Sequence, residues 1–130
     1  MERFSWPVRV YYEDTDTGGV VYYANYLKFF ERARTEWLRS FGLNQDKLAQ
    51  EAGLIFVVRR ALLDFVRPAR LDDMLEVTVE PLKLARVYVQ LAQEARRGAQ
   101  VLARAEIQVA CLNLKGFKPV AIPQSLREKL

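Results

Sequence analysis

The chain has 130 residues, 51% hydrophobic and 28% charged, a balance typical of a folded globular protein and not of a disordered or fibrous one. This length allows one core that buries about two-thirds of the surface of the unfolded chain, so we expect one domain over residues 1–130. The net charge of +4 is modest, and basic residues alternate with acidic ones, which disfavours nucleic-acid binding.

No run reaches the roughly 20 apolar residues of a membrane span. Because the N-terminal segment also lacks the apolar core of a secretion signal, we expect a cytoplasmic protein.

The chain contains no histidine. This absence removes the most common general base, the Ser-His and Cys-His nucleophile pairs, and most zinc sites. The single cysteine, Cys111, cannot form an internal disulfide, and its place in an alternating apolar run favours a buried small hydrophobic side chain. None of the serines stands in a G-x-S-x-G turn. These absences disfavour most zinc sites and nucleophilic serine chemistry, and no metal or redox cofactor is implied.

The first predicted elements are a strand and a long helix. Apolar side chains alternate through Phe4–Tyr12, which predicts a strand, and a polar turn over Glu13–Gly19 ends it. From Ala24 to Phe41 the apolar residues recur every three or four positions, which predicts an amphipathic helix with Gly42 as its stop. We expect the aromatic residues of this helix to pack in the core and not around a cofactor.

Shorter signals follow the long helix. Asn44 is expected to cap a helix that continues through Ala52 and is closed by Gly53. Four β-rich runs come next, with a hairpin turn at Arg97 and Gly98. These predicted strands cover Phe56–Val66, Met74–Leu82, Arg86–Ala95 and Val101–Asn113. The order β-α-β-β-β-β predicts an α+β fold in which an antiparallel sheet wraps the long helix.

The densest group of reactive side chains is the turn before the helix, which holds Asp14, Asp16, Gly18 and Gly19. A calcium loop that starts at Asp14 would require a glutamate at its twelfth position, where Asn25 stands. A purely structural turn is a serious alternative, since Asp, Thr and Gly are all favoured in turns and helix caps. A carboxylate and two glycines before a helix N-terminus, whose free amides stabilise negative charge, instead favour a base beside an oxyanion site.

Two segments resemble a known enzyme family. The run PVRVYYEDTDTGGVVYYANYL from Pro7 to Leu27 is similar to the signature of the YbgC-type and 4-hydroxybenzoyl-CoA thioesterases, which are hotdog-fold enzymes, and the match continues through FERARTEW. A second match is FVRPARLDD from Phe65 to Asp73. The resemblance implies that Asp16 is the catalytic carboxylate and that the Tyr23 backbone amide is the oxyanion donor. Many YbgC-type members carry histidine at the position of Tyr23, so this chain departs from them there.

The resemblance also implies an acyl-CoA substrate and a homo-oligomer, either a dimer or a tetramer of two dimers. We expect Gly18, Gly19 and Asn25 to border the substrate, and Asp14 to hold the turn. Because arginine suits phosphate geometry, we expect the phosphates of coenzyme A to contact basic side chains. The candidates are Arg59, Arg60, Arg67, Arg70 and Arg86. A hotdog dehydratase is disfavoured because those enzymes use a histidine. The remaining alternative is a non-catalytic acyl-ligand-binding or scaffold subunit near the membrane.

Overall fold

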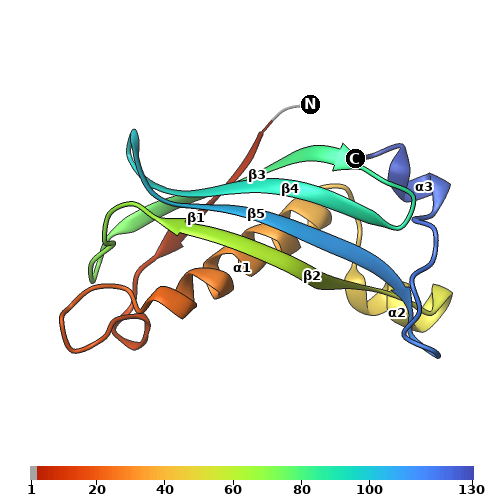
Figure 1. Ribbon diagram of the computed structural model, residues 1–130, viewed down its shortest axis with the longest axis horizontal. Coiled ribbons are helices and arrows are strands. Elements are labelled where there is room, and N and C mark those ends of the chain that lie inside the picture. The colour runs from red at the N-terminus through yellow and green to blue at the C-terminus, as the bar shows by residue number, and fades with distance from the viewer. Residues whose placement is uncertain (1–2) are drawn as a thin grey trace.

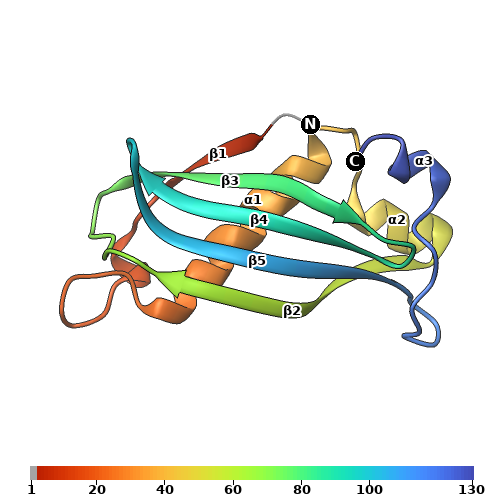
Figure 2. The same cartoon turned by 45° about the horizontal axis from the view of Figure 1, so that its top comes forward.

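The computed structural model describes residues 3–130, which build a five-stranded antiparallel sheet with one long helix across it (Figures 1 and 2). The strand order is β1-β3-β4-β5-β2, so β1 and β2 form the two edges. The expected α+β hotdog arrangement is confirmed. The strands are β1 Phe4–Arg9, β2 Leu54–Phe65, β3 Met74–Leu84, β4 Tyr88–Arg97 and β5 Gln100–Asn113.

Helix α1, Tyr26–Arg39, supplies the aromatic side of the core. Phe29, Phe30 and Ala33 have no exposed surface, and Trp37 has 4%. They pack against inward side chains of the sheet such as Leu75 and Leu91. The three- to four-residue spacing of the apolar positions therefore predicted core packing correctly. Burying one such side chain contributes about 1.5–3 kcal/mol.

Two short helices flank the far end of the sheet, α2 Gln45–Ala52 and α3 Gln124–Arg127 (Figure 1). The cap of α2 is the predicted one, because the Asn44 Oδ1 accepts a hydrogen bond from the Lys47 amide at 3.1 Å. Gly53 ends the helix with φ of +64°. Helix α3 was not predicted, since four residues are too few for a periodic pattern. Within residues 3–130, no helix combines the length and the apolar character needed to cross a bilayer.

Several element ends differ from the sequence-based prediction. Strand β1 stops at Arg9, three residues early, because Tyr12–Asp14 turns into a 3-10 helix, η1. A second 3-10 turn, η2 (Tyr23–Asn25), leads directly into α1. The helix ends at Arg39, and Gly42 takes a left-handed φ of +81° in the turn that follows. Cys111 is fully buried, as expected, and burial raises the pKa of its thiol.

Strand β2 is the longer of the two edges, with 12 residues against six in β1. It pairs with β5 on one side only, and its register shifts between Val58 and Arg60, so that Arg59 forms a bulge. Four large apolar side chains along this edge remain about half exposed. They are Val58, Leu62, Phe65 and Val66. An apolar edge of this length normally requires cover from another part of the protein or from another chain.

Candidate active site

The acidic turn lies in the segment between β1 and α1, at the N-terminal end of the long helix (Figure 1). Thr15 and Val21 form an isolated antiparallel bridge that closes the outer part of this segment into a small hairpin. Inside the hairpin, the Asp16 amide donates to the Val20 carbonyl at 2.9 Å, and the Gly19 amide donates to the Asp16 carbonyl at 3.0 Å. Hydrogen bonds through both its amide and its carbonyl therefore fix the backbone of Asp16.

Of the two aspartates Asp14 and Asp16, Asp14 is the buried one, with 3% of its surface exposed. Its carboxylate accepts hydrogen bonds from the Tyr11 amide at 2.8 Å and from the Asn25 side-chain amide at 2.6 Å. Its carbonyl accepts from the Tyr22 amide at 3.0 Å. These contacts join both ends of the segment, which agrees with the expectation that Asp14 holds the turn.

The carboxylate of Asp16 is exposed. Its Oδ1 accepts one hydrogen bond, from the Gly18 amide at 2.8 Å, and Oδ2 has no hydrogen-bond partner among residues 3–130. A Cβ on Gly18 would lie 3.2 Å from the Asp16 Oδ1, and Gly19 has φ of +77°. The two glycines thus give the carboxylate room and allow the chain to reverse direction.

Tyr23 begins η2, so its amide comes before the first hydrogen bond of that turn. Within the described part of the chain, this amide donates to no acceptor. The Tyr23 ring is 61% exposed, and its centroid lies 6.0 Å from that of Phe65 in an edge-on contact. A shallow groove lies beside this pair and is lined by Val21, Tyr23, Tyr26, Phe65, Val66, Arg67 and Pro68.

The groove is held together by contacts between α1 and the segment after β2. The Ala69 amide donates to the Tyr26 hydroxyl at 3.1 Å, and burial raises the pKa of that hydroxyl. The Val21 amide donates to the Ala69 carbonyl at 2.9 Å. The two sequence motifs, although about 45 residues apart in the chain, therefore form one site.

Asp73 fixes the segment that follows β2. It accepts hydrogen bonds from the Arg70 amide at 2.9 Å and from the Arg97 guanidinium at 2.7 Å. Partial burial alone would raise the pKa of Asp73, but the Arg70 amide and the charge of Arg97 outweigh that effect and lower it. Sequence reasoning missed Arg97 as a positioning residue, because it was read only as part of a hairpin turn.

The other sequence-predicted site residues divide into two groups. Arg67 lines the groove at Tyr23, and the backbone of Arg70 pairs with Val20 of the acidic hairpin. Asn25, predicted to border the substrate, is 9% exposed and gives its side-chain amide to Asp14.

The remaining arginines lie away from the groove. Arg59 lies 3.9 Å from the centre of the Tyr88 ring and donates to Gln108. Arg60 follows it on the β2 edge, and Arg86 stands in the turn between β3 and β4. One protomer thus places Arg67 in the groove at Tyr23 and the backbone of Arg70 beside Val20, with the other three candidates elsewhere.

Comparisons with known proteins find one family over most of the chain. A family model described as the thioesterase-like superfamily matches residues 10–130. The chain is 47% identical over 124 residues to a protein of Haemophilus influenzae named acyl-CoA thioesterase YbgC, a match that covers 95% of this chain and 91% of that one. It is 34% identical to a 1,4-dihydroxy-2-naphthoyl-CoA hydrolase of Thermosynechococcus vestitus, over 90% of this chain and 81% of the other. The solved structure of a probable thioesterase from Bartonella henselae superposes with a TM-score of 0.88 at 37% identity and covers 94% of this chain and all of that one.

Proposed function

Since this chain belongs to the thioesterase-like superfamily, we propose that Asp16 drives the hydrolysis of an acyl-CoA thioester whose carbonyl oxygen is bound by the Tyr23 amide. Acyl-CoA thioester hydrolysis itself is the reaction of this protein, given its 47% identity to an enzyme named for it. The observation that carries the assignment to Asp16 is its exposed carboxylate, with one oxygen unpartnered in the described chain, on a hydrogen-bonded hairpin.

The reaction requires negative charge to be stabilised as it develops on the carbonyl oxygen. The Tyr23 amide is suited to this, because it begins the helical segment and has no internal acceptor among residues 3–130. Removing one such donor from an oxyanion site typically costs about 10²- to 10³-fold in rate. The amide is a backbone group, so tyrosine in place of the histidine common in the family keeps it.

Asp16 either attacks the carbonyl carbon or removes a proton from an attacking water. In both cases a new C–O bond forms, the C–S bond breaks, and coenzyme A leaves as a thiolate that takes up a proton from water. When Asp16 is the nucleophile, the product of this step is an acyl-aspartyl anhydride, which water then hydrolyses to release the acid and restore the carboxylate. Rapid quenching followed by mass spectrometry separates the two routes. A transient acyl group on the peptide that contains Asp16 indicates the nucleophile, and its absence during turnover indicates the base.

We extend the proposal to the groove beside Tyr23, which would take the part of the substrate next to the thioester. Arg67 and Arg70 lie on the segment that forms one wall of the groove. They are therefore the arginines that we propose for the coenzyme A phosphates within one protomer. Contacts from Arg59, Arg60 and Arg86 remain a prediction, since these side chains lie elsewhere on the same chain.

The exposed β2 edge supports a homo-oligomer, a dimer or a tetramer of two dimers. Two copies that meet at β2 would cover Val58, Leu62 and Phe65, which one copy leaves about half exposed. Closed two-fold contacts of this kind satisfy the unpaired backbone groups of an edge strand. A cytoplasmic location remains part of the proposal.

The test is an assay of the purified full chain with short, long and aromatic acyl-CoA esters. We expect thiol release with at least one of them, and its loss in Asp16→Asn. Asp46→Asn is the matched control, because Asp46 is an exposed aspartate on α2, remote from the hairpin. Hydrolysis that survives in Asp16→Asn would refute the assignment to Asp16. Binding without any hydrolysis by the unsubstituted chain would favour a scaffold.

A further inference from the structure

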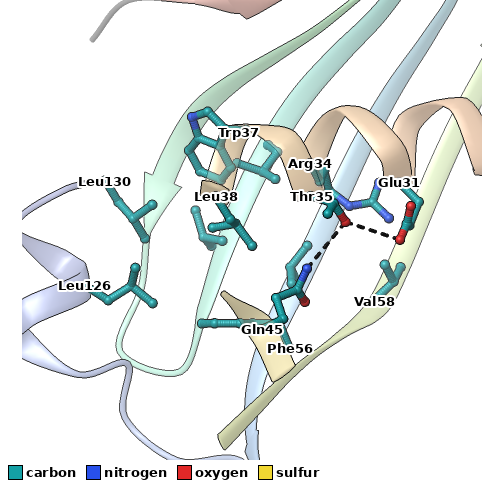
Figure 3. Close-up of a pocket in the computed structure, with 13 residues that line it drawn as sticks. Glu31, Arg34, Thr35, Trp37, Leu38, Gln45, Phe56, Val58, Leu126 and Leu130 are labelled. Atoms are coloured by element: carbon teal, nitrogen blue, oxygen red, sulfur yellow. Dashed lines mark hydrogen bonds between the residues drawn. The ribbon is translucent and has the colours of Figure 1, made fainter. Parts of the chain in front are cut away.

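A second cavity lies between the C-terminal half of α1 and the sheet, away from the acidic hairpin (Figure 3). Its volume is about 170 Å³. Most of its wall is apolar and comes from α1, β2 and the C-terminal segment. The side chains that define it are Trp37, Leu38, Phe56, Val58, Leu126 and Leu130. The acyl-transfer chemistry proposed for Asp16 uses none of them.

One wall of the cavity carries a guanidinium that is mostly withdrawn from water. The Arg34 Nη1 donates to the Gln93 Oε1 at 2.9 Å. Gln93 is 1% exposed and is fixed by hydrogen bonds from its Nε2 to the carbonyls of Phe30 at 3.1 Å and Thr78 at 3.2 Å. Burial lowers the pKa of Arg34, the nearby charge of Glu31 offsets part of this effect, and an arginine remains charged at neutral pH. Arg34 is thus held in place by a neutral amide.

No carboxylate lies within ion-pair distance of Arg34 in the described part of the chain. Glu31, the nearest acidic residue that lines the cavity, is exposed and accepts a hydrogen bond from the Thr35 hydroxyl at 3.2 Å. Gln45 donates to the same hydroxyl at 3.4 Å (Figure 3). The cavity therefore has a fixed cation inside and an anion at its solvent-exposed side.

We propose that this cavity binds a small amphipathic carboxylate, with its apolar body against Trp37 and Leu38 and its carboxylate on Arg34. A guanidinium has five N–H donors and favours planar, two-pronged contact with a carboxylate. Arg34 is partly buried and has no carboxylate within ion-pair distance in the described chain, and the ligand would supply that partner. A cavity of roughly 150 Å³ takes up benzene, so the body would have about six carbons.

Two sources can supply this chemistry, a free carboxylic acid or the far end of a dicarboxylic acyl thioester. Arg34 lies eight residues after Tyr26, which places it about 12 Å further along the helix axis. Tyr23 precedes Tyr26 by three residues, so an acyl chain of about six carbons attached there is shorter than this span. Only a longer dicarboxylic acyl chain could reach Arg34 within one protomer.

The test follows Trp37 fluorescence in the full-length chain. Trp6→Phe leaves Trp37 as the only tryptophan, because the chain has two. In this background, hexanoate and cyclohexanecarboxylate should change the emission, and Arg34→Gln should weaken their binding about tenfold or more. Binding of 1-hexanol should change less than threefold. Arg39→Gln, which removes an exposed arginine of the same helix, is the matched control and should leave the carboxylate affinity unchanged.

A second variant keeps the test decisive if Arg34→Gln folds poorly. Glu31→Gln removes the competing negative charge, so carboxylates should bind severalfold more tightly. No saturable binding of either carboxylate, or equal loss of carboxylate and alcohol in Arg34→Gln, would overturn the proposal. Weaker carboxylate binding in Glu31→Gln would also contradict it.

The source is then identified with hexadecanedioyl-CoA and hexadecanoyl-CoA, whose chains are long enough for this span. If Arg34 binds the acyl end, Arg34→Gln lowers kcat/KM for the first substrate relative to the second. If it binds a free acid, that ratio stays constant while hexanoate binding is lost. Fluorescence titrations repeated in Asp16→Asn do not depend on hydrolysis, so failure of this proposal is distinguishable from failure of the proposed catalytic role of Asp16.

Discussion

The inner and outer halves of the acidic segment contain the same residue type in opposite environments. In the inner half, the Asp14 carboxylate is buried and accepts hydrogen bonds from Tyr11 and Asn25. In the outer half, the Asp16 carboxylate is exposed and accepts one hydrogen bond, from Gly18. A carboxylate whose two oxygens both accept hydrogen bonds from the protein stabilises a loop. A carboxylate with one oxygen free of such bonds is available to react. On the function proposed for Asp16, the D-x-D pattern combines an anchor with a reactive group.

The largest expected effect separates these roles by activity. Asp16→Asn should lower kcat for the best acyl-CoA substrate by about 10²- to 10⁴-fold, because an amide is neither a base nor a nucleophile. The melting temperature should stay within about 2 °C of the unsubstituted protein, since the exposed carboxylate makes one local hydrogen bond. Steady-state kinetics and calorimetry measure the two quantities. A large drop in melting temperature would show that Asp16 is also an anchor.

The next effect concerns stability. Asp14→Asn should reduce the free energy of unfolding by about 2 kcal/mol, because an asparagine keeps one acceptor oxygen for the two donors of Tyr11 and Asn25, so its NH₂ group faces one of them donor against donor. Urea denaturation measures the change. Adding Asn25→Asp to the same chain reverses the polarity of the pair and should recover part of the loss. No recovery in the double variant would mean that the stabilisation by Asp14 comes from the Tyr11 amide instead.

These two aspartates also show how far sequence reasoning reached. The strand and helix order, the long helix and the cap at Asn44 follow from periodicity and composition, because each depends on neighbours along the chain. Asp14 and Asp16 could be assigned different roles from the motif, but burial had to come from the structure.

Arg34 was not singled out, because an arginine among charged residues on a helix predicts a solvent-facing side chain. In the structure its guanidinium instead donates a hydrogen bond to the side chain of Gln93 on β4. Likewise, no local pattern could indicate that Arg67 lies at the hairpin and Arg86 does not. Such contacts depend on how distant segments pack.

The third prediction compares the two sheet edges. The chain should sediment as a dimer or larger at micromolar concentration, and Leu62→Glu on the β2 edge should weaken self-association about tenfold or more. Leu62 is 50% exposed in one copy, and a two-fold contact would bury it in both partners. Analytical ultracentrifugation measures the association. The matched control is Ser5→Lys on the β1 edge, which introduces a charge there, keeps a partner for the Glu76 carboxylate and should have no effect. A monomer that still hydrolyses acyl-CoA would contradict pairing at β2.

A smaller effect is expected for the arginines beside the outer half of the segment. Arg67→Gln should raise KM for acyl-CoA severalfold at low salt, while Arg86→Gln should leave it unchanged. Exposed charge contacts are screened over about 8 Å at physiological ionic strength, so the difference should shrink as salt rises. An acyl-pantetheine, which lacks the nucleotide, serves as the control substrate. Equal rises in KM for both substrates would show that Arg67 does not contact the nucleotide.

The smallest effect is predicted for Tyr23→Phe, which removes the hydroxyl and keeps the backbone amide. The ring remains able to pack edge-on against Phe65, and the direction of the amide is set by η2. We therefore expect kcat/KM to change less than about threefold, against the 10²- to 10³-fold typical of losing an oxyanion donor. A loss of the larger size would assign the role to the hydroxyl.

Tyr22→Phe is the matched control, because Tyr22 is the exposed neighbouring tyrosine and its ring centroid lies 4.9 Å from that of Tyr23. If both variants lose activity equally, the contact between the two hydroxyls shapes the groove, and the oxyanion assignment must be tested at the backbone instead, by replacing the Tyr23 amide with an ester.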